Sequence, residues 1–434
     1  MQFGDNKIKT GKTGFEPLKT NTGPKPETNI IPRLGEEQSQ VPGAAFVPGT
    51  PIKLNLKFDP RQINPEKPVV NYRQHTAPDE KTAIIDGFKL KDDLDEDKKT
   101  DFPHGEMVTI IASNGEVQTI PLERNFIETA DRLREVRQRA EQGEDISQVN
   151  ISLGIKMNIE DLNRVLGYDK KPDVEQLTPA NIKSKHAEIY ELMKQKYEFA
   201  NSPERQAEIK QLEEQKREIV TQLYSDKTEE ENQQLKSRYN ELRQVIDDHY
   251  HMLGFERPIQ IYDEIEKLAS PELNIPVVIA AGNKDEHEMA NNTDIVNLYS
   301  INPNAVVVGA FDEGGNIAEF SAESSLVDVY TKGVYTPADI GEANAKKLTS
   351  IQQKMSENPG LSSSEVINTS GSKIRGSSFA APYASKNYVR EMQLAGMNVV
   401  QINQSLEKAR DMAQTESISI DKAVEKVINA YKKQ

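Results

Sequence analysis

The sequence of 434 residues contains no cysteine, no long apolar run and fewer basic than acidic residues. Without cysteine, the chain has no disulfides, no thiolate nucleophile and no cysteine-ligated metal site. No stretch reaches the length of a membrane-spanning helix, and the N-terminus lacks the apolar core of a signal peptide. These features predict a soluble protein with no membrane partner, cytoplasmic by default.

The charge balance also narrows the class of partner. The chain has 54 Lys and Arg against 69 Asp and Glu, which gives a net charge of -15. Binding to phosphate backbones depends on surplus positive charge, so we expect no nucleic-acid partner. Hydrophobic residues make up only 36% and charged residues 28%, which indicates that part of the chain builds no core.

The first 78 residues are the part that fits this description. They are rich in Pro, Gly, Thr and Lys, and their apolar residues follow no period. We predict a disordered N-terminal arm over residues 1–78. A folded inhibitory propeptide is the alternative.

Beyond residue 78, short apolar runs alternate with helical patterns. The runs that predict strands are residues 82–85, 149–154, 276–281 and 305–310, and a helical spacing covers residues 125–141. Strands that are apolar on both faces and alternate with helices predict an α/β fold, a parallel sheet covered by helices.

A block of different character, residues 158–269, interrupts this pattern. Its apolar residues recur at steps of three and four. Ser202 and Pro203 are typical of a helix start, and Thr228 with Glu231 forms a capping-box pattern. The block predicts three helices in an antiparallel, coiled-coil-like arm. That arm either binds a protein partner or packs on its own domain, and it divides the main domain into residues 79–157 and 270–434.

The most specific word in the sequence is Gly-Ser-Ser-Phe-Ala-Ala-Pro, residues 376–382. A turn of small residues exposes Ser378 at the start of a helix, whose free amides and positive dipole favour a developing oxyanion. Ser378 is therefore a candidate nucleophile. A plain helix cap before a buried alanine-rich helix is the alternative.

Three other polar residues stand at the ends of predicted elements. Asn283 follows the strand that ends at residue 281, at the sheet edge where ligands bind, and its amide is a candidate oxyanion donor. Asp86 ends the first strand, where a carboxylate can orient a histidine, and His104 begins an apolar helix as a candidate general base. Each residue taken alone fits a capping or turn role equally well.

The order Asp, His-Gly, Ser-Leu-Gly, Ala-Ala-Gly-Asn, Gly-Ser-Ser-Phe-Ala-Ala-Pro resembles the subtilase family of serine proteases. This resemblance implies a subtilisin-like sheet with helices on both faces and a serine endopeptidase acting on polypeptides. It implies Asp86 as the histidine-orienting acid, His104 as the base, Ser378 as the nucleophile and Asn283 as an oxyanion donor. It also implies substrate binding along Ser152, Leu153 and Gly154, with Gly282 lining the pocket for the side chain before the scissile bond.

The family pattern is not matched everywhere. Its Asp-Ser/Thr-Gly reads Asp86-Gly87-Phe88, and its His-Gly-Thr-His reads His104-Gly105-Glu106-Met107. Only 18 residues separate Asp86 from His104, which is short for the family. No member of the triad is lost. The alternative function is a catalytically weak or inactive scaffold that binds a protein partner through its helical arm.

The chemistry implied by the resemblance requires no cofactor. Calcium often stabilises members of the family, but the sequence shows no recognisable calcium-binding loop, so metal binding is left open. His249 and His251 stand two residues apart on a predicted helix and do not share a face. We therefore expect surface histidines there rather than a metal pair.

Overall fold

The structure is a computed structural model. It describes residues 71–75, 80–88, 104–113, 117–123, 129–170, 173–225, 228–341, 346, 369–370 and 373–433. The predicted N-terminal arm, residues 1–78, lies almost entirely outside the described residues.

The core is a six-stranded parallel sheet in the order β2-β1-β3-β5-β7-β8. Its strands are β1 (Lys81–Asp86), β2 (Thr119–Glu123), β3 (Ile146–Ile151), β5 (Val277–Ala280), β7 (Ala305–Phe311) and β8 (Val329–Lys332). The four predicted strands are confirmed with shifted ends, while β2 and β8 were not predicted. Buried apolar side chains on both faces of β1, β5 and β7 explain why the sheet lies between two helical layers.

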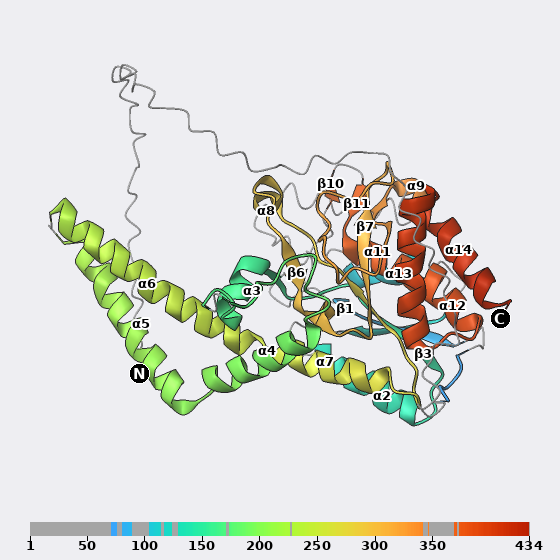
Figure 1. Ribbon diagram of the computed structural model, residues 1–434, viewed down its shortest axis with the longest axis horizontal. Coiled ribbons are helices and arrows are strands. Elements are labelled where there is room, and N and C mark those ends of the chain that lie inside the picture. The colour runs from blue at the N-terminus through green and yellow to red at the C-terminus, as the bar shows by residue number, and fades with distance from the viewer. Residues whose placement is uncertain are drawn as a thin grey trace, which may run out of the picture. The chain divides into compact units, whose positions relative to one another are not determined.

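Helices cover both faces, as predicted (Figure 1). On one face α2 (Thr129–Glu141) and α7 (Glu256–Leu268) contribute apolar side chains to a cluster with β1, β3, β5 and β7. On the other face the covering helices are α1 (His104–Ser113), α11 (Ser377–Ala384), α13 (Val399–Glu416) and α14 (Ile420–Tyr431). The chain is therefore α/β, with each functional side chain presented from a buried layer.

Residues 158–269 are largely helical. They contain α3 (Ile159–Leu166), α4 (His186–Ala200), α5 (Pro203–Leu223) and α6 (Glu229–Gly254), besides α7. The predicted cap at Ser202 is confirmed because its side chain accepts the amide of Arg205, and Thr228 and Glu231 form the predicted capping box. Figure 1 shows α5 and α6 side by side. The hydroxyl of Tyr250 on α6 donates a hydrogen bond to the carboxylate of Glu213 on α5. Coiled-coil packing of these helices stays a prediction.

Two details of this block differ from expectation. The stretch ends in α7, whose Ile261, Ile265 and Leu268 belong to the core beneath the sheet rather than to an arm. The expectation of a surface histidine at position 249 was wrong, because His249 is only 2% exposed. It lies three residues after Ile246 and three before Met252, both buried, so it shares the inward face of α6.

Smaller elements complete the domain. β4 (Lys156–Asn158) pairs with β6 (Ile295–Asn297), and β11 (Lys373–Arg375) pairs with β9 (Val334–Tyr335) and β10 (Thr369–Ser370). The short helices are α8 (Glu286–Ala290), α9 (Pro337–Ile340), α12 (Arg390–Leu394), the 3₁₀ segment Leu298–Ile301 and the π segment Ser385–Val389. Across the described residues, no helix combines the length and the apolar character that a membrane crossing requires.

Candidate active site

Asp86 is the last residue of β1 and is completely buried. Its Oδ1 atom accepts a hydrogen bond from the amide of Gly87 at 2.6 Å and lies 2.8 Å from Nδ1 of His104. Its Oδ2 atom has no hydrogen-bond partner among the described residues. The strand thus delivers a carboxylate at the carboxyl edge of the sheet, with one oxygen aimed at an imidazole.

His104 begins α1, and the start of that helix is held against the loop after β1. The amide of Gly105 donates to the carbonyl of Gly87 at 2.9 Å. A Cβ atom added at Gly105 would stand 2.9 Å from that same oxygen and from the ring of Phe88. A glycine directly after the histidine is therefore what lets the ring approach Asp86 so closely.

The imidazole of His104 bridges an acid and a hydroxyl. An ionised carboxylate only accepts hydrogen bonds, so Nδ1 carries the hydrogen that faces Asp86. This tautomer leaves Nε2 as an acceptor, and Nε2 lies 3.0 Å from Oγ of Ser378. The ring also packs against Phe379, with centroids 5.1 Å apart. The three predicted residues are thus joined in one hydrogen-bonded chain.

Ser378 is the second residue of α11 and is 8% exposed. The fully buried Ala380, Ala381 and Ala384 pack α11 in the cluster with β5 and β7, where larger side chains would hold the helix farther away. Upstream, the amide of Gly376 donates to the carbonyl of Gly333 at 2.9 Å. The nucleophile candidate therefore stands on a turn that is anchored at both ends.

Asn283 follows β5 and faces the same turn. Its Oδ1 atom accepts the amide hydrogen of Ser377 at 2.8 Å, which directs Nδ2 the other way. A Cβ atom added at Gly376 would stand 2.9 Å from Oγ of Ser378 and 3.2 Å from Nδ2 of Asn283. The amide donor and the hydroxyl thus border one small space, the position in which a tetrahedral oxyanion needs donors.

Two further residues shape this turn and were not predicted from the sequence. Gly376 must be glycine because any side chain would enter the space between Asn283 and Ser378. The Oγ atom of Ser377 accepts the amide of Gly282 at 3.1 Å, which ties the end of β5 to the start of α11. Both belong to the sequence motif around Ser378, residues 376–382. The run of small residues in that motif was the feature that could have indicated their roles.

The predicted substrate segment, Ser152 to Gly154, continues directly from β3. Gly154 is packed so tightly that a Cβ atom there would lie 2.0 Å from Oδ1 of Asn297. The Nδ2 atom of Asn297 donates to the carbonyls of Ala280 at 2.8 Å and Leu153 at 3.4 Å. Asn297 thereby links this segment to the end of β5, and nothing in the sequence pattern had singled it out.

Gly282, the predicted pocket residue, has φ +107°, a conformation that L-residues with side chains rarely adopt. Its position lies within 4 Å of Asn297 and Ala322, as measured from the place a Cβ atom would take. The structure therefore brings Gly282 close to the segment around Leu153, to which Asn297 is also bonded. The predicted binding residues and the triad occupy one edge of the sheet.

A metal site was left open by the sequence. Within the residues that the structure describes, no group of three or more His, Asp or Glu side chains is arranged to hold a metal ion.

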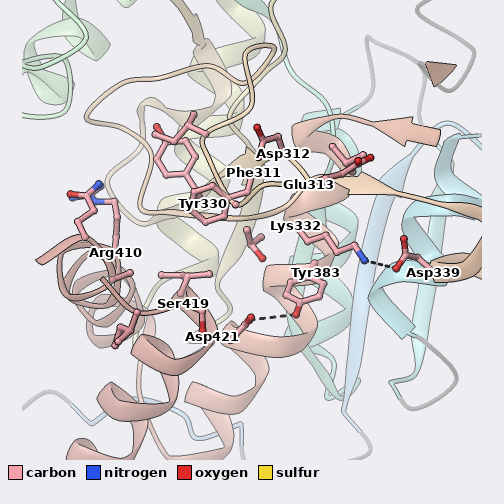
Figure 2. A pocket seen from close by; sticks show the side chains of 18 of the residues that line it. Phe311, Asp312, Glu313, Tyr330, Lys332, Asp339, Tyr383, Arg410, Ser419 and Asp421 are labelled. Carbon is pink, nitrogen blue, oxygen red and sulfur yellow. Dashed lines mark hydrogen bonds and ion pairs between the residues drawn. The ribbon is translucent and has the colours of Figure 1, made fainter. Parts of the chain in front are cut away.

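A separate hollow of about 680 Å³ lies beside the ends of β7 and β8 and the α13–α14 turn. Figure 2 shows that Lys332 pairs with Asp339 and that the hydroxyl of Tyr383 bonds to Asp421 among the residues that line it. None of the four candidate catalytic residues lines it. The hollow is therefore not part of the candidate active site.

A protein-family model matches this chain. The model of the subtilase family, peptidase S8, matches residues 184–420, which is more than half of the chain. The matched range contains Asn283 and Ser378, whereas Asp86 and His104 precede it. The search of curated proteins found no match.

Several solved structures are similar at low identity. The nisin leader peptidase NisP from Lactococcus lactis is 14% identical, with a TM-score of 0.32, over 77% of this chain and 82% of that one. The self-cleaved protease domain of PatA is 13% identical, with a TM-score of 0.35, over 81% and 96%. A cold adapted subtilisin-like serine proteinase is 14% identical, with a TM-score of 0.32, over 78% and 86%. Values this low say nothing about substrate.

Proposed function

Since the chain belongs to the subtilase family of peptidases, we propose that it is a serine endopeptidase that cleaves polypeptides through Ser378. The observation that carries the proposal is the hydrogen-bonded chain from Asp86 through His104 to Ser378, with distances of 2.8 and 3.0 Å. Residues with this connectivity convert a weakly nucleophilic hydroxyl into one that attacks a carbonyl carbon.

In the first half of the reaction, Oγ of Ser378 attacks the scissile carbonyl and its proton passes to Nε2 of His104. Asp86 holds the ring in the required tautomer and stabilises the imidazolium that forms. The carbonyl oxygen becomes an oxyanion, which accepts hydrogen bonds from Nδ2 of Asn283 and the backbone amide of Ser378. The C–N bond then breaks, and the leaving amine takes the proton from His104.

In the second half, water takes the place of the amine. His104 removes a proton from the water as it attacks the acyl-enzyme, and the same donors hold the second oxyanion. The ester bond breaks, Oγ of Ser378 regains a proton from His104, and the carboxylic acid product leaves. Each group ends in its starting state, so no co-reactant besides water is consumed.

Substrate binding in this proposal uses the segment from Ser152 to Gly154. An extended peptide adds there as a further strand, so main-chain hydrogen bonds supply affinity without regard to sequence. The absence of a side chain at Gly282 leaves room for the substrate residue that precedes the scissile bond. The anchoring of Leu153 by Asn297 keeps this segment at a fixed distance from the serine.

The proposal is tested by incubating the full chain with a library of unstructured peptides and identifying new termini by mass spectrometry. We expect internal cleavage products with the wild-type protein and none with Ser378→Ala. Products that appear equally with Ser378→Ala would place the chemistry elsewhere. No products with folded wild-type protein would favour the inactive scaffold.

A further inference from the structure

Arg375 is a cation placed three residues before the candidate nucleophile. It ends β11, where its backbone pairs with Val334 of β9, and the next residue, Gly376, is bonded to Gly333. The guanidinium lies over the ring of Phe320, 5.8 Å from its centroid. The backbone of Arg375 is therefore held by the same strand pairing and turn that hold Ser378. Its guanidinium packs on the ring of Phe320, which forms an aromatic platform.

Among the described residues, this arginine lacks the acidic partner that a guanidinium usually has. Within the described part of the chain, Arg375 forms no ion pair, and its buried Nε atom has no hydrogen-bond acceptor. Lys373, two residues earlier on the same strand, is paired with Glu313 at 2.6 Å. A buried donor without an acceptor carries a desolvation cost, so no described side chain has been placed to neutralise this cation.

The platform under Arg375 lies next to the oxyanion residue. Asn283 and Ser321 form an isolated antiparallel bridge, and the amide of Lys284 donates to the carbonyl of Phe320 at 2.6 Å. In the sheet, β5 lies between β3 and β7. The segment Ser152–Gly154 follows β3 and Phe320 follows β7, so they flank Asn283 on opposite sides.

This placement divides the substrate between two sides. A peptide whose acyl part pairs with Ser152–Gly154 has its leaving-group part directed toward Phe320 and Arg375. The planar guanidinium matches a carboxylate, with which it forms two parallel charge-assisted hydrogen bonds.

We propose that Arg375 determines specificity, selecting substrates with an aspartate or glutamate side chain within two residues after the scissile bond. This inference rests on the proposed endopeptidase function, because it defines two sides of the same serine. It names the substrate class as polypeptides that are acidic just beyond the cleavage point.

The test uses internally quenched peptides whose cleavage point has been fixed by mass spectrometry. Two amidated peptides differ only in Glu or Gln at the first or second position after that point, and a third has neutral side chains and a free C-terminal carboxylate two residues after it. The full chain is assayed at about 0.15 M salt, where long-range repulsion from its net charge is largely screened. The quantity compared is the ratio of kcat/KM for the Glu peptide to that for the Gln peptide.

We expect a ratio of about ten or more for the wild type, the size of effect typical of a hydrogen bond between charged groups. In Arg375→Gln the ratio falls to about one, and Arg375→Glu cleaves a fourth peptide, with Lys at that position, faster than the Gln peptide. Lys373→Gln is the matched control and keeps the wild-type ratio, because Glu313 already engages Lys373. Each ratio is taken within one protein, so a loss of folded enzyme cancels.

Four results would overturn the inference. A wild-type ratio near one, or a ratio that Arg375→Gln leaves intact, removes Arg375 from specificity while leaving the endopeptidase proposal standing. Faster cleavage of the free-carboxylate peptide than of the Glu peptide assigns the guanidinium to chain ends instead of side chains. No cleavage of any peptide contradicts the proposed function itself, and the inference falls with it.

Discussion

The Nε2 atom of His104 lies 3.0 Å from the Oγ atom of Ser378, although 274 residues separate the two in the chain. The contact depends on two helices that begin at the same edge of the sheet, α1 at His104 and α11 one residue before Ser378. A parallel sheet makes this convergence possible, because the carboxyl ends of its strands meet on one edge. Substitution of the residues at this edge is therefore expected to affect one shared reaction.

Replacing Asp86 with asparagine is expected to lower kcat by about 10⁴, the cost of presenting the wrong tautomer of the histidine. An amide nitrogen facing Nδ1 makes Nδ1 an acceptor and moves the hydrogen to Nε2. That atom then cannot take the proton of Ser378. Steady-state hydrolysis of a quenched peptide measures the loss. Asp86→Asn activity within tenfold of wild type would show that this carboxylate does not orient the base.

Replacing Asn283 with alanine is expected to lower kcat by about 10²–10³ with little change in KM. The amide donates to charge that develops only after the serine attacks, so its loss weakens binding of the transition state more than that of the substrate. Separate determination of kcat and KM checks the prediction. A rise in KM at constant kcat would mean that Asn283 binds the substrate rather than the oxyanion.

Replacing Gly154 with alanine is expected to destabilise the protein by about 1–3 kcal/mol, as overpacking does, and to lower kcat/KM. The new Cβ atom would stand 2.0 Å from Oδ1 of Asn297, which would then have to release Ala280. Chemical denaturation and peptide hydrolysis measure the two effects. Gly254→Ala serves as the control, since no atom lies within 4 Å of its added Cβ and alanine favours the helix. Equal stability of the two variants would contradict the packing described here.

The buried Asp328 should make stability depend on pH. Burial raises the pKa of Asp328 from 3.8 to about 6, even though Lys183 and the amide of Val307 favour the charged form. The folded protein therefore holds this proton more tightly than the unfolded chain does. Its contribution to the free energy of unfolding is full below about pH 4 and is lost as the pH rises through about 6.

The loss is expected to be about 3 kcal/mol, since the pKa rises by about two units and one unit corresponds to about 1.4 kcal/mol. Urea denaturation of wild type and Asp328→Asn between pH 3.5 and 7 measures it as the difference between the two proteins. The wild type should lose stability relative to the variant as the pH rises. Parallel curves over this range would show that Asp328 has no raised pKa.

The strands and helices that position the site were largely predictable, because burial leaves a direct trace in the sequence. The apolar runs of β1, β5 and β7 and the small residues after Ser378 each mark a layer of the core. β2 escaped prediction because it is mostly half-buried or exposed, with Leu122 as its buried side chain, so it has no continuous apolar run. The family resemblance supplied the proposed roles, which the spacing alone did not distinguish from caps.

The sequence did not reveal the contacts that polar side chains make with residues far away in the chain. Asn297 joins Leu153 to Ala280, and the guanidinium of Arg375 packs on the ring of Phe320. Neither Asn297 nor Arg375 belongs to a recognisable sequence motif. Their significance depends on which strands lie side by side, and strand order is not written in local periodicity. His249 was misjudged for a related reason, since its inward direction follows from the helix face that α6 buries.

The central claim is that Ser378 is an activated nucleophile. Its most direct test is labelling of the native full chain with a fluorophosphonate probe, followed by mass-spectrometric mapping of the adduct. We expect one adduct on Ser378, labelling that disappears in Ser378→Ala, and much slower labelling in Asp86→Asn. Folded wild-type protein that forms no adduct at Ser378, or labelling that persists in Ser378→Ala, would contradict it.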